Sequence, residues 1–184
     1  MKEAKTINED KAVAWLSERL ALKCGCCPEE ARHIKAAAKL HDAGKAFMPP
    51  DILHKPDMLL PHEFEQMKLH TIYGARILLD IQGEAGRFAA TAALLHHEWY
   101  NGQGYWGFKA STLPGYIGIV AVCDVYVALV SQRAYKKAWP HYEALRYIEQ
   151  QAGSQFCPKL ALDFVSMADG LKIKNDGLLT NICI

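Results

Sequence analysis

Two adjacent pairs of ionisable residues and two isolated ones interrupt the apolar stretches of this 184-residue chain. The pairs are His41-Asp42 and His96-His97, and the isolated residues are His70 and Asp124. Most of them stand at the end of an apolar run or inside one, where an unpaired polar group is costly. A single buried histidine is usually satisfied by its neighbours in the core, but two pairs and a buried aspartate are harder to explain by packing.

The pairing of these residues indicates the kind of site they form. Neighbours on a helix point about 100° apart, so adjacent ligands serve one site only at a helix end or around several metal ions. Imidazole and carboxylate ligands without thiolate suit Mn, Fe, Ni or Zn. Asp42 is the natural bridging ligand, and two neighbouring metal ions suit an in-line displacement at phosphorus. The pattern therefore predicts a multi-metal site for phosphoester hydrolysis.

The same residues fall within an ordered series of short motifs. The segments are His41-Asp-Ala-Gly-Lys45, Ile52-Leu-His-Lys-Pro56, His70-Thr-Ile-Tyr-Gly74, His96-His-Glu98, Asn101-Gly-Gln-Gly-Tyr105, Val120-Ala-Val-Cys-Asp124 and Arg133-Ala-Tyr-Lys136. In order and spacing they resemble the HD-x-G-K, I-L-x-K-P, H-x-x-x-G, H-H-E, D-G-x-G-Y, V-A-x-x-D and R-P-Y-K motifs of HD-GYP domains, a subfamily of the HD-superfamily phosphohydrolases. The likeness extends over residues 28–160.

This resemblance implies an all-α HD-domain bundle that hydrolyses a cyclic dinucleotide. The favoured substrate is cyclic di-GMP, with linear pGpG as product and GMP as a second potential product. The implied metal ligands are His41, Asp42, His70, His96, His97 and Asp124, holding two or three divalent ions, with Fe or Mn favoured. Asp42 and Lys45 would be catalytic, and Lys45, Tyr105, Trp106, Arg133 and Lys136 would bind the substrate.

The chain also departs from the family pattern. Trp106 stands where the Gly-Tyr-Pro signature has proline, which removes a rigid residue and adds a flat surface. Asn101, Val127 and Gln132 replace acidic residues that are usual in the family. An ungapped alignment places Glu9 where family members carry a further metal ligand, although an acidic residue near a helix start has an equally good structural explanation.

Helical periodicity supplies the elements that would position these residues. Helices are expected over residues 8–23, 28–40, 61–70, 72–81, 88–98, 116–135, 141–152 and 158–169, the third and fourth being potentially one. This gives seven or eight helices in a single domain over 1–184, with a core of about 9–169 and a weakly patterned tail over 170–184. Gly and Pro predict short turns over residues 44–60, and Gly83 and Gly86 predict a break.

Two segments leave alternatives open. The β-branched content of residues 117–130 suits a buried strand, but their length favours a buried helix. Residues 99–115 are rich in glycine and aromatic residues, which is typical of a binding rim. If the protein has a signalling partner, this loop is where the contact is expected.

Composition narrows the class of protein. A formal net charge of +1 gives no basic field for duplex nucleic acid, and no apolar run has the length of a membrane span. The first ten residues carry no signal-peptide core, so a cytoplasmic protein with reduced thiols is expected. The six cysteines are Cys24, Cys26, Cys27, Cys123, Cys157 and Cys183, and they do not form two Cys-x-x-Cys pairs. His33, His54, His62 and His141 are expected to have surface or structural roles.

Three other functions compete with this interpretation. The chain could act on another nucleotide, bind a cyclic dinucleotide as a sensor without turning it over, or serve as a purely helical interaction domain. The retention of all six metal-ligand positions favours an active enzyme. Metal identity, oligomeric state and regulatory input are left open by the sequence.

Overall fold

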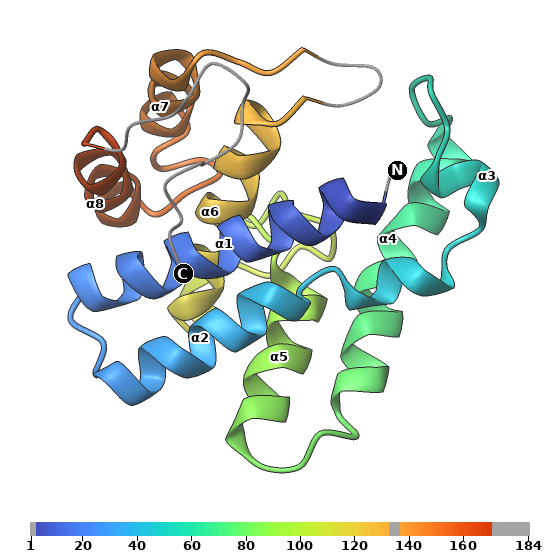
Figure 1. Ribbon diagram of the computed structural model, residues 1–184, viewed down its shortest axis with the longest axis horizontal. Helices are drawn as coiled ribbons and strands as arrows, with labels where there is room; N and C mark the ends of the chain where they lie inside the picture. The colour runs from blue at the N-terminus through green and yellow to red at the C-terminus, as the bar shows by residue number, and fades with distance from the viewer. Residues whose placement is uncertain (1–2, 133–136, 171–184) are drawn as a thin grey trace.

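The computed structural model describes residues 3–132 and 137–170, and it describes side chains from Glu9 onward. Within these residues lie eight α-helices and no β-strand: α1 Glu3–Lys23, α2 Pro28–Leu40, α3 Pro50–Leu53, α4 Pro61–Leu78, α5 Glu84–Leu95, α6 Tyr116–Val130, α7 His141–Gln150 and α8 Pro158–Ala168. Two 3-10 helices, η1 Ala43–Phe47 and η2 Ala110–Thr112, lie in the connections. The predicted all-α bundle of seven or eight helices is confirmed (Figure 1).

Helices α1 and α2 form an antiparallel hairpin that packs side by side (Figure 1). The turn between them is tight because Gly25 adopts a positive φ of 92°. Cys27 then caps α2, with its Sγ accepting the backbone N–H of Glu30, and Pro28 begins the helix. The hairpin therefore delivers the C-terminal end of α2, and the His41-Asp42 pair that follows it, to the middle of the molecule.

Gly44 and Gly74 allow the His41–Lys45 and His70–Gly74 motifs to lie close together in space. A Cβ atom on Gly44 would lie 1.9 Å from the backbone oxygen of His70 and 2.4 Å from the backbone nitrogen of Gly74. Only glycine allows η1 to lie this close to α4. The backbone contact fixes the position of Asp42 relative to His70.

Helix α4 is continuous from Pro61 to Leu78, so the two helices expected over residues 61–81 are one. Helix α5 begins at Glu84, four residues before the predicted start, because Gly83 rather than Gly86 makes the break. Gly83 has a φ of 85°, whereas Gly86 lies inside α5, where a Cβ would meet the carbonyl oxygen of Ile81 at 1.8 Å. The prediction of a break at Gly86 was wrong because that glycine permits a close approach.

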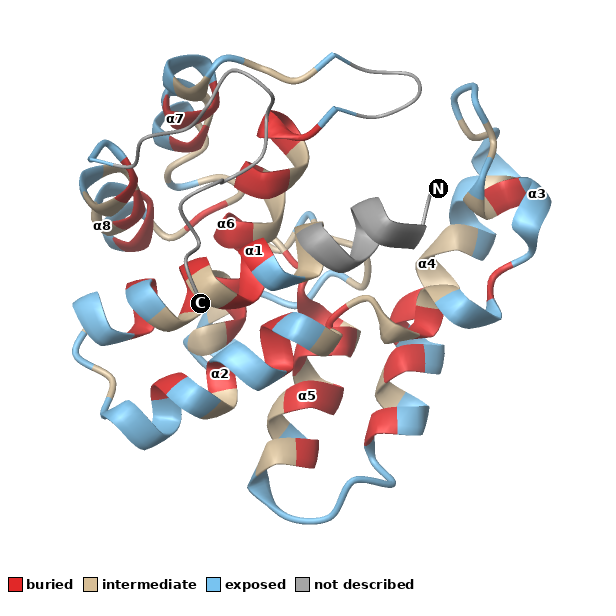
Figure 2. Cartoon of the chain, in the orientation of Figure 1, coloured by how far each residue is buried: buried red, intermediate tan, exposed pale blue. Residues whose placement is uncertain are grey.

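Helix α6 is the buried centre of the bundle, as Figure 2 shows by its mostly red ribbon. It is a helix and not a strand, and its side chains pack against α1 and α7. It ends at Val130, five residues before the predicted end. Because neighbours surround it on all sides, it can carry the buried Asp124 into the interior.

Helix α1 begins at Glu3, five residues before the predicted start, and α4 and α5 each end three residues before the predicted ends. Helix α2 has the predicted bounds, and α7 and α8 end two residues and one residue early. The predicted tail beyond Gly170 falls outside the described residues. Within the described part of the chain, no helix combines the length and the apolar character needed to cross a bilayer.

Candidate metal centre

Four helices and the residues that directly follow them bring the predicted ligands together. His41 and Asp42 follow the last turn of α2, His70 lies within α4, His96 and His97 follow α5, and Asp124 lies within α6. His41, His70 and His96 are each no more than 2% exposed. All six residues contribute an atom to one continuous cluster, which is called the metal centre below.

Backbone carbonyls orient three of the histidines. Nδ1 of His41 lies 2.6 Å from the oxygen of Ala38, and Nδ1 of His70 lies 2.6 Å from that of Met67. Nδ1 of His96 lies 3.0 Å from the oxygen of Ala92. Each contact favours the tautomer with hydrogen on Nδ1, which leaves a lone pair on Nε2, as in histidines that bind metal ions.

The three Nε2 atoms point at Asp42 but find no hydrogen-bond partner there. They lie 3.4, 3.3 and 3.7 Å from the Asp42 carboxylate, for His41, His70 and His96 respectively. These atoms and Asp42 Oδ1 are fully buried and lack a hydrogen-bond partner in the described protein. Buried polar atoms are seldom left unsatisfied, so this set needs a ligand at its centre.

The cluster divides into three overlapping groups whose ligand atoms lie within 4.8 Å of one another. The first contains Asp42, His70, His96 and His97, the second His41, His96 and Asp124, and the third Asp10, His41 and Asp42. Asp42, His41 and His96 each belong to two groups, so neighbouring ions could share them. Histidine and carboxylate donors without thiolate fit hard or borderline divalent metal ions. The donor set and the unsatisfied atoms both fit metal binding.

Electrostatics separate the histidines into two kinds. Burial opposes the charged form of His41, but the carboxylates of Asp42 and Asp124 outweigh it and raise the pKa of His41 to about 9. Burial and the neighbouring His97 and His41 hold the pKa of His96 well below its usual value. Burial also lowers the pKa of His97 to about 4. His96 and His97 are therefore neutral at pH 7 and ready to donate lone pairs.

The carboxylates of the centre are ionised in spite of their burial. Burial opposes the charge on Asp42, while Lys45 and His41 lower its pKa well below the usual value. Burial likewise opposes the charge on Asp124, whose pKa is lowered by the contact with His41. The ammonium group of Lys45 pairs directly with Asp42. The HD-x-G-K motif thus places a metal-binding carboxylate and a cation side by side.

Asp10 of α1, and not Glu9, joins the cluster. Asp10 shares a group with His41 and Asp42, whereas Glu9 belongs to none of the three groups. Burial raises the pKa of Asp10 to about 6, His41 opposes that shift, and the charge of Asp42 adds to it. The neighbouring carboxylate of Asp10 therefore stands where Glu9 was expected to contribute a ligand.

The 99–115 loop covers one side of the centre and is held by two anchors. Glu98 is 5% exposed, and its two carboxylate oxygens accept the backbone N–H groups of Trp106 at 2.7 Å and Phe108 at 2.8 Å. The indole nitrogen of Trp106 donates to Thr71 Oγ1 of α4 at 3.2 Å. Trp106 therefore replaces the conformational constraint of proline with a hydrogen bond across to α4.

Tyr105, which precedes Trp106 in the loop, contacts the metal centre directly. The ring of Tyr105 lies 4.3 Å, centroid to centroid, from that of His97 and 6.4 Å from that of His70. Gly104 makes this position possible, since a Cβ there would lie 2.4 Å from the Cα of Glu98. The Gly-x-Gly-Tyr segment thus holds an aromatic ring against a predicted metal ligand.

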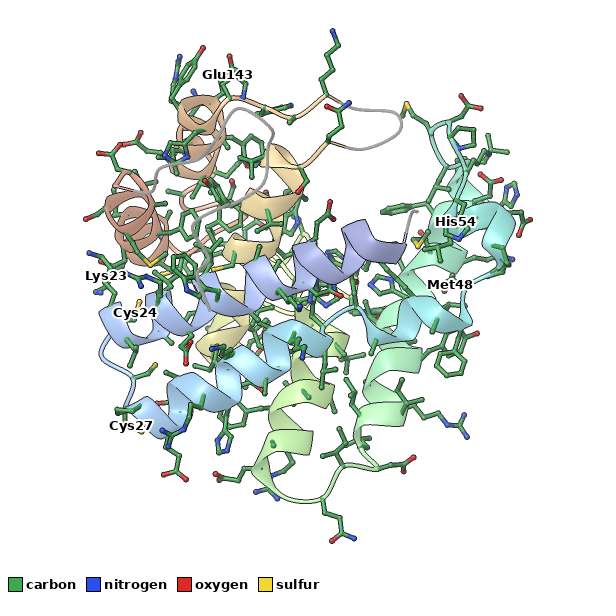
Figure 3. All side chains as sticks on the ribbon, in the orientation of Figure 1. Lys23, Cys24, Cys27, Met48, His54 and Glu143 are labelled. Carbon is green, nitrogen blue, oxygen red and sulfur yellow. The ribbon has the colours of Figure 1, made fainter. Side chains whose placement is uncertain are left out.

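Arg133 and Lys136, the remaining residues of the predicted site, fall outside the described residues. Four residues that were expected to play no part in the site lie away from the metal centre. His54 follows α3 at the edge of the molecule and belongs to no metal-binding group (Figure 3). Cys24 and Cys27 lie at the turn between α1 and α2, where Cys24 Sγ donates to Asp163 (Figure 3). His141 has a structural contact, with Nδ1 2.9 Å from the hydroxyl of Tyr126.

A cavity of about 1180 Å³ opens between α6, α8 and the 99–115 loop. Its walls include the aromatic rings of Phe88, Trp99, Tyr100 and Tyr116, and none of the six predicted ligands lines it. The cavity is therefore separate from the metal centre. Glu98 lines it while also holding the loop that covers the centre.

Solved structures share this fold. A HDG"Y"P protein from Bdellovibrio bacteriovorus superposes with a TM-score of 0.73 at 20% identity, covering 90% of this chain and 53% of that one. The PgpH HD domain of L. monocytogenes in complex with cyclic-di-AMP superposes with a TM-score of 0.65 at 18% identity, covering 94% and 93%. At these identities the likeness concerns the fold.

Curated relatives are closer in sequence. A cyclic di-GMP phosphodiesterase from Thermotoga maritima is 40% identical over 167 residues, covering 90% of this chain and 45% of the relative. The cyclic di-GMP phosphodiesterase response regulator RpfG from Xanthomonas campestris pv. campestris is 41% identical over 141 residues, covering 76% and 37%. A 3'3'-cGAMP-specific phosphodiesterase from Vibrio cholerae is 38% identical over 149 residues, covering 80% and 28%. This chain spans less than half the length of each of these relatives.

The family model for the HD domain matches residues 1–160, a range that contains all six predicted ligands together with Asp10. The resemblance inferred from the motifs is confirmed by this match. The chain belongs to the HD-domain family.

Proposed function

We propose that this chain is a metal-dependent phosphodiesterase that hydrolyses a cyclic dinucleotide, with cyclic di-GMP as the favoured substrate and linear pGpG as the product. The observation that supports it most directly is the set of buried Nε2 atoms from His41, His70 and His96 directed at Asp42 without hydrogen-bond partners. Relatives at about 40% identity carry the name cyclic di-GMP phosphodiesterase.

The proposed roles follow from the contacts of each residue. Asp42 would be a ligand shared by adjacent ions, because it belongs to two of the ligand groups. Two or three divalent ions, with Fe or Mn favoured, would supply Lewis-acid activation of water and neutralise phosphoryl charge. Lys45, which is paired with Asp42, holds the scissile phosphate through its ammonium group. Asp10 completes the ligand set on the α1 side.

The remaining substrate contacts are assigned to the loop and to two cations. Tyr105 and Trp106 border the centre on the loop side, where they limit the space available to the nucleotide. Arg133 and Lys136, which lie outside the described residues, are proposed to hold a phosphate or a guanine edge, as the family resemblance implies.

A substrate panel tests this function. Protein purified without oxygen and loaded with Fe(II) or Mn(II) is incubated with cyclic di-GMP, 3'3'-cGAMP, cyclic di-AMP and mononucleotides, and the products are separated by chromatography. The expected result is conversion of cyclic di-GMP to pGpG that is abolished by chelation. Hydrolysis of mononucleotides alone would contradict the proposal.

The names of the relatives favour one alternative substrate. Some are cyclic di-GMP phosphodiesterases, and others are named 3'3'-cGAMP-specific phosphodiesterases. Both substrates are cyclic dinucleotides and differ in one base, so the metal centre serves either. The same panel decides between them through the ratio of kcat/KM for the two substrates.

We also propose that the 99–115 loop contacts a signalling partner and that the protein works in the cytoplasm. Tyr100 and Phe108 of this loop are 41% and 49% exposed, which leaves two aromatic side chains accessible for such a contact. Affinity capture from lysate with wild type and with Phe108→Ser tests the contact, and cell fractionation tests the location.

A further inference from the structure

Two residues of α4 surround the loop tyrosine beside the metal centre. The ring of Phe64 lies 5.6 Å from that of Tyr105 in an edge-to-face contact. Lys68, one helical turn further on, places Nζ over both rings, 5.2 Å from the centroid of Phe64 and 5.7 Å from that of Tyr105. Since Tyr105 also contacts His97, the Lys68 ammonium lies one aromatic ring away from a predicted metal ligand.

Tyr105 has little free ring surface, whereas Phe64 has much. His97, His70, Phe64 and Lys68 all lie against the Tyr105 ring, and Tyr105 is only half-exposed. Phe64 is 41% exposed, so its ring is the one that can accept a planar ligand. The ring that can stack on a nucleotide base is therefore that of Phe64 on α4, and not that of Tyr105 in the loop.

Lys68 is placed to act as a point charge. Its side chain is 16% exposed, and its ion pair joins Glu65, whose side chain is 67% exposed, at 2.7 Å. Pairs with a well-exposed partner are screened by water and exchange readily. A phosphate that approaches over Phe64 would therefore compete well with Glu65 for the ammonium.

We propose that Phe64 and Lys68 form a substrate-binding shelf, in which Phe64 stacks on a base and Lys68 pairs with the phosphodiester that is not being cleaved. The proposal rests on the function proposed above. A cyclic dinucleotide carries two phosphodiesters in one ring, so when one is bound at the metal centre, the other is held close by and needs its own cation.

The shelf is tied to the same anchors as the loop. Thr71 Oγ1 donates to the backbone oxygen of Lys68 and accepts the indole N–H of Trp106. Helix α4 and the loop therefore meet at Lys68, and a shift of the loop alters the space above Phe64. This connection makes Trp106 a positioning residue for the shelf.

Steady-state kinetics of the Mn(II)-loaded protein test the proposal with two substrates. Cyclic di-GMP has bases and a second phosphate, and bis(p-nitrophenyl) phosphate has neither. For Lys68→Ala we expect the KM for cyclic di-GMP to rise about fivefold, and for Phe64→Ala about tenfold. In both variants kcat should change less than twofold, and the ratio of kcat/KM for cyclic di-GMP to that for the small diester should fall. Lys68→Arg should restore most of the KM, and added salt should weaken binding more for wild type than for Lys68→Ala.

Matched controls come from the same chain. Arg76→Ala removes an exposed cation two turns further along α4, and Tyr142→Ala removes an exposed ring on α7. Neither control should change the KM for cyclic di-GMP. If Lys68→Ala and Phe64→Ala match these controls within twofold, or lower turnover of both substrates equally, the shelf is wrong.

A binding measurement separates the shelf from the proposed function. The Kd of a hydrolysis-resistant phosphorothioate analogue of cyclic di-GMP is measured by calorimetry for all five variants and for wild type. If wild type hydrolyses only the small diester, the proposed function fails, yet the shelf stands if this Kd rises in Lys68→Ala and Phe64→Ala. An equal Kd in wild type, both shelf variants and both controls would overturn it.

Discussion

Nε2 of His70 lies 3.3 Å from Oδ1 of Asp42, although the two residues come from different parts of the chain, and neither atom has a hydrogen-bond partner in the described protein. Two buried lone-pair atoms that face each other in this way gain most of their stabilisation when a cation lies between them. Asp42 is also the residue shared by the two groups that contain His70 and Asp10. Removing it should disrupt two neighbouring ion positions at once.

For Asp42→Ala we therefore expect the bound metal to fall by at least one ion per chain and diester hydrolysis to fall about a thousandfold or more. Elemental analysis and turnover of bis(p-nitrophenyl) phosphate measure the two effects. Asp51→Ala, on the exposed surface of α3, is the matched control and should change neither. Full metal content in Asp42→Ala would show that this carboxylate is not a shared ligand.

Gly44 offers a test of the scaffold under the centre. A methyl group there would overlap the carbonyl of His70, so η1 would have to move away from α4. We expect Gly44→Ala to lower the free energy of unfolding of the metal-free protein by about 3 kcal/mol. Urea denaturation measures it. Gly115→Ala, where a Cβ meets nothing within 4 Å, should change stability by less than about 0.5 kcal/mol. Equal effects of the two substitutions would contradict the close-approach explanation.

The six predicted ligands could be found from the sequence because each is a polar residue in an apolar helical context. His96 and His97 follow a run of alanine and leucine, and Asp124 interrupts the most apolar helix of the chain. A polar residue in such a position needs a binding partner, and the ordered motifs indicated that the partner is a metal ion. The mainly helical fold could be predicted because the apolar residues recur with the period of a helix.

Asp10 could not be found in this way. By helical periodicity, Glu9 lies on the same side of α1 as the buried Leu16 and Leu20. Asp10 in the same way lies on the side of the buried Ser17 and Ala21. Periodicity therefore assigns both carboxylates to a buried side of the helix. Which of these sides faces the metal centre depends on how α1 packs on α2, and periodicity carries no information about that packing. The anchors of Trp106 were missed for a similar reason, because Thr71 is far from it in sequence.

The raised pKa of Asp10 predicts a pH-dependent effect on stability. In the metal-free protein the folded state binds this proton up to about pH 6, whereas the unfolded chain releases it near the usual aspartate pKa of 3.8. The folded state therefore holds more protons in this interval, so stability falls as pH rises through it and stays reduced above pH 6. Asp10→Asn removes this penalty. We expect the variant to be more stable at pH 7.5 by about 1 kcal/mol, after discounting for solvent screening.

Metal ions should reverse the sign of this effect. With Mn(II) bound, ionised Asp10 becomes a favourable ligand, and Asp10→Asn should then be less stabilised by the metal than wild type. Thermal unfolding at pH 7.5 without Mn(II) measures the stability difference between Asp10→Asn and wild type, and unfolding with Mn(II) measures how far the metal stabilises each protein. Glu9→Gln is the matched control. An identical difference between Asp10→Asn and wild type in the two conditions would place Asp10 outside the ligand set.

Glu98 provides the sharpest test of how the loop is held. Each of its carboxylate oxygens accepts one backbone N–H, from Trp106 and from Phe108. In Glu98→Gln the amide keeps one acceptor and turns an NH₂ group toward the other N–H, so one buried bond is lost and two donors face each other. We expect a loss of about 2 kcal/mol in the free energy of unfolding.

The local readout separates this role from a general loss of stability. Hydrogen exchange of the Trp106 and Phe108 amides should quicken in Glu98→Gln well before exchange in α6 does, because only the loop is released. The KM for a cyclic dinucleotide should rise with it, since Tyr105 is carried by the same loop. Glu65→Gln, a largely exposed carboxylate on α4, should leave the exchange of both amides unchanged. If exchange of the two loop amides in Glu98→Gln matches wild type, the loop is held by the Trp106–Thr71 hydrogen bond and not by Glu98.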